Sequence, residues 1–181
     1  MIGITTSIKP STKTLQLAYE FLNVVPNSCF FKRKQLSIAR VLSFFIKKKV
    51  NTILIFIEKK KNFFQIWQIN ILRKTIIKFK IEQAVLKKKL KLIKSSVCRP
   101  ELIFYNFEKK IGKICSLFFC DLFENCPDFK KRQVIFFCLS KNRILFRHYR
   151  YLFSSSGKDV KLQELGPRFI LKILHISKFV L

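Results

Sequence analysis

The residues of this chain that could do chemistry are cations set among aromatic rings near its carboxyl end. Residues 146–151 read FRHYRY, and residues 161–172 read KLQELGPRFILK. An arginine offers a planar fork of N–H donors that matches phosphate oxygens, and a neighbouring tyrosine can stack on an unpaired base. This chemistry suits a polyanion better than a small substrate. We therefore expect RNA contacts from a set of basic side chains: Lys32, Arg33, Arg147, His148, Arg150, Lys161, Arg168 and Lys172.

Several of these assignments have structural alternatives. Arg147 and Arg150 could belong to a strand face that is merely solvated. Arg168 could equally well pair with Glu164 or with a backbone carbonyl. For His148, a core position with satisfied hydrogen bonds is slightly the better expectation. The sequence leaves these alternatives open.

A rigid turn is expected to position the last of these cations. Gly166 can adopt a positive φ, and Pro167 fixes the next φ at about −65°. Arg168 then begins a strand in which Phe169 and Leu171 alternate with cations at positions 168 and 172. This alternation predicts one apolar face and one basic face.

Hydrophobic periodicity predicts an α/β protein in two related halves. Helices are expected after the caps Ser11 and Ser37, and a third helix with a buried face is expected before a turn at Asn125 and Pro127. The face of that third helix is Ile111, Ile114, Cys115, Phe118 and Leu122. Strands are expected at residues 2–6, 29–31, 52–57, 63–69, 77–81, 134–139 and 143–153, and from residue 168. We expect one domain over residues 1–181, with halves at 1–86 and 99–181 joined by a basic connection at 87–98.

The overall charge narrows the class of partner. Lys plus Arg number 37 against 10 acids, a net charge of +27. Self-repulsion of this size favours a polyanionic partner, with nucleic acid first and an anionic membrane surface second. AT-rich coding can inflate Lys, Ile and Phe, but it does not easily explain the arginines. The longest apolar runs, at residues 53–57 and 134–139, are far shorter than the roughly 18–20 residues of a membrane span.

The sequence does not predict an enzyme, a cofactor or a metal site. Asp121, Glu124 and Asp128 lie at a helix end and its turn without a facing base or metal ligand. The six cysteines include no CxxC pair, and His148 and His175 do not complete a zinc pattern. A glycine-rich phosphate loop and a nucleophile–histidine pattern are also missing. We expect reduced thiols in an intracellular compartment.

Motifs in the second half are similar in wording and order to those of Brix-domain ribosome biogenesis proteins. They read RPELI at 99–103, NF at 106–107, RQV at 132–134, FRHYRY at 146–151 and LQELGPRF at 162–169. The first half agrees more weakly, through TTS, KPS, VPN and FKR segments at residues 5–7, 9–11, 25–27 and 31–33. One departure is residues 68–75, which read QINILRKT where the family usually has a Gly-Pro motif.

The resemblance implies a Brix fold of two halves, each similar to the anticodon-binding α/β domain of some tRNA synthetases. It also implies a non-enzymatic factor for large-subunit assembly in the nucleolus. Such a factor binds pre-rRNA and a dedicated protein partner within a pre-ribosomal particle, and not a membrane. The composition resembles that of a reduced, AT-rich genome such as a nucleomorph. The alternatives are a small-subunit Brix factor, a basic peripheral membrane protein or an organellar ribosomal protein.

Overall fold

The structure is a computed structural model that describes residues 1–60, 63–86, 98–123 and 126–178. It divides into two compact units. Unit 1 comprises Met1–Ile81 together with the described residues of Lys172–Leu181, and unit 2 comprises Glu82–Leu171. We expected residues 99–181 to form one half, but residues from 172 onward group with unit 1. The expected connection at 87–98 lies almost wholly outside the described residues.

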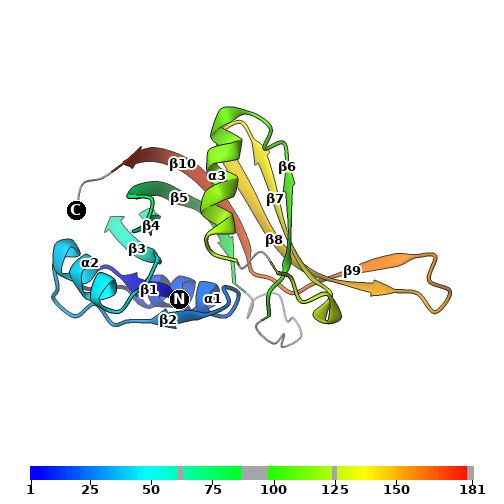
Figure 1. Cartoon of the computed structure of the whole chain (residues 1–181), viewed down its shortest axis with the longest axis horizontal. Helices are drawn as coiled ribbons and strands as arrows, with labels where there is room; N and C mark the ends of the chain where they lie inside the picture. Colours follow the sequence, from blue (N-terminus) through cyan, green and yellow to red (C-terminus); the bar gives the residue numbers. More distant parts are fainter. Residues whose placement is uncertain (61–62, 87–97, 124–125, 179–181) are drawn as a thin grey trace. The chain divides into compact units, whose positions relative to one another are not determined.

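Unit 1 contains a mixed sheet in the order β2-β1-β3-β4-β5, with β10 next to β5 (Figure 1). The strands are β1 (Ile2–Thr6), β2 (Ser28–Phe30), β3 (Thr52–Lys60), β4 (Phe63–Asn70), β5 (Thr75–Val85) and β10 (Arg168–Lys178). β1 is parallel to both β2 and β3, and β4 is antiparallel to β3 and β5. Ile53 to Phe56 are 0–1% exposed, as expected of a strand that is covered on both faces.

Two helices cover opposite faces of this sheet. α1 (Thr12–Leu22) begins at Ser11, whose hydroxyl accepts a hydrogen bond from the Thr14 N–H, and its Phe21 ring meets Phe56. α2 (Ile38–Lys47) begins at Ser37 in the same way, which confirms both predicted caps. Its Phe45 packs over Ile53 and Ile55, on the other face of β3. A Cβ atom at Gly3 would lie 2.3 Å from the Phe45 ring, so glycine is required where β1 passes α2.

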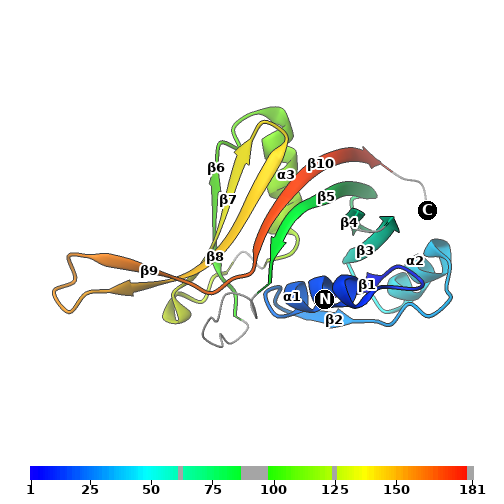
Figure 2. The ribbon, with the colours of Figure 1, turned by 180° about the vertical axis from the view of Figure 1, so that it is seen from behind.

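Unit 2 contains a sheet in the order β10-β8-β7-β6, with β9 also paired to β8. Its further elements are β6 (Glu101–Tyr105), α3 (Lys110–Cys120), a 3₁₀ turn (Phe129–Lys131), β7 (Gln133–Ser140), β8 (Arg143–Phe153) and β9 (Val160–Glu164). β6 runs parallel to β7, while β7–β8 and β8–β9 are antiparallel. The ends of β8 and β9 form an arm, residues 151–163, that extends beyond the rest of the unit 2 sheet (Figures 1 and 2).

Two strands of unit 2 differ from expectation. No strand was expected between residue 99 and the third helix, but Glu101–Tyr105 form β6. The strand is short and lies at the edge of the sheet, and its sequence has no clear period. Its extended conformation comes from pairing with β7. β9 was likewise not predicted, because residues 160–164 gain their strand pairing from the β8–β9 hairpin.

The buried face of α3 also differs from the predicted face. Cys115 and Phe118 are buried as expected, but Ile111 is 48% exposed. The reason lies at Gly112, where an added Cβ would meet the Phe107 backbone at 2.7 Å. This close approach turns the glycine side of the helix inward and Ile111 outward. The helix ends at Cys120 rather than near residue 125, which lies outside the described residues.

Candidate nucleic-acid interface

The unit 2 sheet has one face covered by α3 and one that no α-helix of the described part of unit 2 covers. On the covered face, the Phe137 ring stacks on Phe119 of α3 at 4.2 Å and meets Phe146 at 5.5 Å. Phe169 of β10 continues this row, 5.6 Å from Phe146. Side chains between these residues point to the other face because strand positions alternate. Figure 2 views the unit with β7 and β8 in front of α3.

We call this second face the open face. It carries alternate residues of four strands, in the register Ile103–Phe136–Arg147 across β6, β7 and β8. Its members are half-buried or exposed, and Tyr105 remains 57% exposed. They mix aromatic rings, aliphatic side chains and cations: Ile103, Tyr105, Phe136, Cys138, Arg143, Leu145, Arg147, Tyr149, Tyr151, Arg168 and Ile170.

The two arginines of the FRHYRY segment do not share a face. Arg147 lies on the open face, opposite Phe136, whereas Arg150 follows the buried series of Phe146 and His148. The unbroken β7–β8 register, which pairs Arg150 with Gln133, leaves no bulge that could bring the two together. The expectation of a joint Arg147–Arg150 surface is therefore wrong.

His148 lies in the core and not on a surface. It is 3% exposed, its Nδ1 lies 3.1 Å from the Gly166 carbonyl oxygen, and its Nε2 lies 3.0 Å from the Gln133 Oε1. The prediction that His148 contacts RNA is corrected by this burial, and the alternative of a hydrogen-bonded core histidine is confirmed. The side chain ties β8 to the Gly166 turn, where Gly166 has the expected positive φ of 58°.

Arg168 pairs with Glu164, which was the structural alternative to an RNA contact. Its Nε and Nη2 donate to the two carboxylate oxygens of Glu164 at 2.6 and 2.5 Å. This charged partner raises the pKa of the Arg168 guanidinium. The side chain is nevertheless 41% exposed on the open face. The predicted alternation of β10 is confirmed by Phe169 and Leu171, which are 1% and 2% exposed.

Acids bind two other members of the open face. Arg143 donates to Glu82 at 2.6 Å, and the Tyr151 hydroxyl donates to Glu101 at 2.6 Å. Arg147 differs, because no carboxylate among the described residues pairs with it. Its Nη1 donates to the Phe146 carbonyl oxygen at 3.2 Å. Arg147, which lies next to Phe136 and Tyr149, is therefore the cation of this face that is not paired with an acid among the described residues.

The residues that β6 and β7 place on this face were not predicted from the sequence. Tyr105 and Phe136, with ring centres 6.4 Å apart, were not singled out as site residues. Residues 133–140 read QVIFFCLS, in which polar and apolar types do not alternate, so no signal in the sequence marks the exposed side of this strand. The β6–β7 pairing is what makes it part of a surface. Of the other predicted residues, Lys161 is exposed on β9 and Lys172 is half-buried in unit 1.

The two candidates in unit 1 have different surroundings. Lys32 is exposed, whereas Arg33 is 9% exposed and its Nε donates to the Leu36 carbonyl oxygen at 2.9 Å. Burial lowers the pKa of the Arg33 guanidinium. Both residues line a pocket of about 280 Å³ together with phenylalanine side chains. Arg33 is thus no part of an exposed basic face, contrary to expectation.

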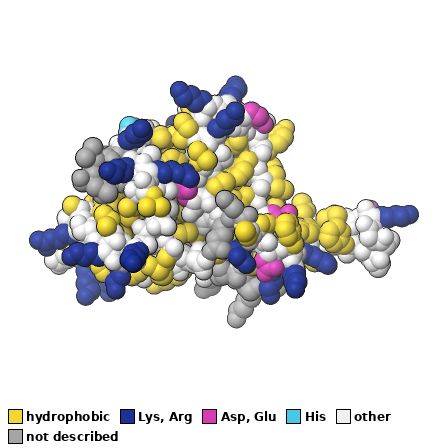
Figure 3. Space-filling view, viewed as in Figure 1, with side chains coloured by type: hydrophobic (Ala, Val, Ile, Leu, Met, Phe, Trp, Pro, Cys, Tyr) yellow, Lys and Arg dark blue, Asp and Glu magenta, His cyan; other side chains and the backbone are white. Residues whose placement is uncertain are grey.

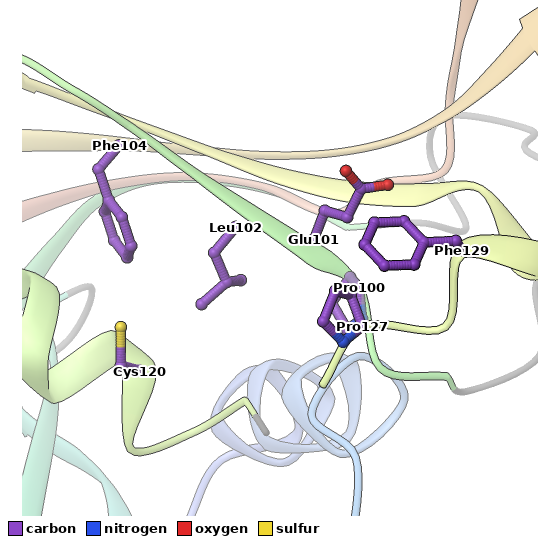
Figure 4. Close-up of a pocket in the computed structure, with 7 residues that line it drawn as sticks. All are labelled: Pro100, Glu101, Leu102, Phe104, Cys120, Pro127 and Phe129. Carbon is purple, nitrogen blue, oxygen red and sulfur yellow. The ribbon is translucent and has the colours of Figure 1, made fainter. Parts of the chain in front are cut away.

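A second pocket, of about 370 Å³, lies in unit 2 between β6 and the end of α3 (Figure 4). Leu102, Phe104 and Cys120 form its apolar wall, and Glu101 borders it with its carboxylate bound by Tyr151. A lining without a basic side chain does not suit phosphate. Across the face of the molecule seen in Figure 3, lysines and arginines greatly outnumber acids, and the arm shows apolar side chains.

The described residues contain no group of three or more metal-ligating side chains. Their helices are all too short or too polar to cross a membrane.

Comparison with known proteins places the chain in a family. The Brix domain family matches residues 7–175. Ribosome production factor 1 of Pongo abelii is 31% identical over 98% of this chain and 51% of that protein. The same-named protein of Saccharomyces cerevisiae is 30% identical over 98% of this chain and 60% of that protein. The chain thus spans about half the length of the curated relatives it matches.

A solved structure agrees at the level of the fold. The probable ribosomal biogenesis protein from Aeropyrum pernix K1 superposes with a TM-score of 0.64, at 14% identity over 94% of each chain. The predicted α/β Brix fold is therefore confirmed. Since the family match covers nearly the whole sequence, this chain belongs to the Brix domain family.

Proposed function

We propose that this chain is a non-enzymatic assembly factor of the large ribosomal subunit that binds pre-rRNA through the open face of unit 2. The observation that carries the proposal is Arg147, a half-buried cation with no carboxylate partner among the described residues, set between Phe136 and Tyr149. The net charge of +27 and the relatives named ribosome production factor 1 support it.

The open face suits single-stranded or distorted RNA better than a regular duplex. Flat rings on a sheet can stack on splayed bases, and an arginine among them can hold the intervening phosphate. Tyr105, Phe136 and Tyr149 provide rings on three neighbouring strands. Such a surface holds an immature rRNA segment without chemistry, which is the action of a structural chaperone.

Exposed cations elsewhere add affinity that does not depend on sequence. Lys32 and Lys161 are exposed, and each phosphate contact releases condensed counterions. Binding should therefore weaken steeply as salt is raised. We assign this action to the nucleolus and to a pre-ribosomal particle.

The arm supplies a surface for the dedicated protein partner. Leu152, Phe153, Val160 and Leu162 are 40–63% exposed on it. Apolar side chains that gather at an exposed, partly unpaired strand are typical of protein docking sites. The arm is separate from Arg147, so RNA and partner need not compete.

The test compares Arg147→Gln with Lys158→Gln, a matched loss of one charge at the exposed tip of the arm. Fluorescence anisotropy with pre-rRNA fragments should show roughly fivefold or more weaker binding for Arg147→Gln, since about 1 kcal/mol is lost with a charge-assisted contact. Lys158→Gln should change affinity much less. Equal effects of the two substitutions would remove the open face as the RNA site.

A further inference from the structure

Arg33 is a buried cation that the described protein does not neutralise. Its side chain is nine-tenths buried, and its hydrogen bond to the Leu36 carbonyl uses one of five N–H donors. No carboxylate among the described residues pairs with it, and burial lowers the pKa of its guanidinium. A buried charge without a counter-charge is destabilising. This arrangement points to an anion that comes from outside the chain.

The pocket around Arg33 has a cationic side and an aromatic side. Lys32 and Lys34 lie next to Arg33 in its lining, and both are exposed. The loop turns at Lys34, whose φ is 52°. The same lining includes Phe31, Phe44 and Phe45, which form an aromatic cluster.

The aromatic cluster is tightly packed but not closed. Phe31 meets Phe44 at 5.4 Å and Phe45 at 5.0 Å, in edge-to-face arrangements. Phe45 is 1% exposed, whereas Phe44 remains 38% exposed. An aromatic ring left open beside three consecutive cations can stack on a neutral base while the cations bind the phosphate attached to it.

We infer that this pocket of unit 1 holds one unstacked nucleotide of RNA. The phosphate lies against Arg33 between Lys32 and Lys34, and the base packs on Phe44. The amino end of α2 begins at Ser37, directly after Leu36 of the lining, and adds positive potential near the pocket. An acidic peptide would use the cations equally, but it would not require the open aromatic ring.

This inference rests on the proposed RNA binding, but it concerns a site in the other unit and a different ligand size. Arg147 should govern affinity for long pre-rRNA fragments, whereas Arg33 should govern affinity for very short RNA. The proposal for the open face and the proposal for the Arg33 pocket can therefore be refuted independently.

The experiment uses the full chain and a 5′-phosphorylated tetrauridylate that contains one 4-thiouridine. We expect photo-crosslinks at Phe31 or Phe44 by mass spectrometry, and roughly tenfold weaker binding of the tetranucleotide by Arg33→Met, since a charge-assisted contact is lost. Lys48→Gln, at the opposite end of α2, is the matched charge control and should bind nearly as well as the wild-type chain. A second variant, Phe44→Ala, should weaken the tetranucleotide while leaving inorganic phosphate binding unchanged.

Stability separates this role from a structural one. Without ligand, Arg33→Met should melt at the same temperature as the wild-type chain or higher, because an unpaired buried charge is replaced by an apolar side chain. A lower melting temperature with unchanged tetranucleotide affinity would overturn the inference. Inorganic phosphate that competes as well as the tetranucleotide would overturn the base contact, and preferential binding of hexaglutamate would replace RNA by an acidic protein.

Discussion

Replacing Glu164 with glutamine should weaken the fold slightly and strengthen RNA binding. Glu164 accepts two hydrogen bonds from Arg168, at 2.6 and 2.5 Å, and neutralises it. The side chains are 18% and 41% exposed, so water screens the pair. Its loss should lower the urea midpoint of unfolding only slightly, as is typical of exposed ion pairs.

The same substitution frees a cation on the open face. Arg168 then becomes available for a phosphate beside Tyr149, and the net charge rises by one. One further phosphate contact on single-stranded RNA should steepen the slope of log affinity against log salt by about 0.7. At low salt, affinity should rise roughly fivefold, equivalent to about 1 kcal/mol.

Anisotropy titrations at several salt concentrations and urea unfolding measure the two effects. Asp159→Asn, in the exposed turn of the arm, changes the net charge by the same amount and serves as the control. If Glu164→Gln binds RNA no better than Asp159→Asn does, Arg168 does not contribute to the interface. Weaker RNA binding with an unchanged fold would refute the assignment of this face.

Two further predictions concern stability. Phe137→Ala should lower the free energy of unfolding in urea by about 3–5 kcal/mol, because this fully buried ring stacks on α3. Phe136→Ala, on the open face, should lower it much less and should weaken RNA binding. Similar losses of stability from both substitutions would contradict the description of two different faces. Hydrogen bonds from Ser11 and Thr14 lower the pKa of Glu58 below its ordinary 4.5 in the folded state, so its contribution is present above that value and is lost as pH falls through the folded pKa. Between pH 7 and pH 3, the melting temperature should fall further for the wild-type chain than for Glu58→Gln. Equal falls would show that the Glu58 carboxylate does not contribute to the pH dependence of stability.

Local features of the fold were predictable from the sequence. Ser11 and Ser37 begin helices because a hydroxyl before an apolar helical period satisfies the first free N–H groups. The Gly166 turn followed from a conformational preference that the residue carries itself. β6 was missed because pairing with another strand decides its conformation.

The candidate site was less predictable. FRHYRY placed cations and rings together along the chain, but alternation sends Arg147 and Arg150 to opposite faces. The burial of His148 and Arg33 depends on what packs around them, which spacing alone does not encode. Among the described residues, Arg143 and Arg168 are paired with acids and Arg147 is not, and this difference depends on side-chain contacts that the sequence does not encode.

The division of β10 between the units has a consequence for biosynthesis. Its first four residues belong to unit 2 and the remainder to unit 1, where the strand lies beside β5. During translation, β5 emerges long before the strand that covers its edge. The edge of the amino-terminal unit therefore stays unpaired while the ninety residues between Ile81 and Lys172 are made. An early nascent chain is exposed to strand-mediated aggregation, and it matures only when the last strand arrives.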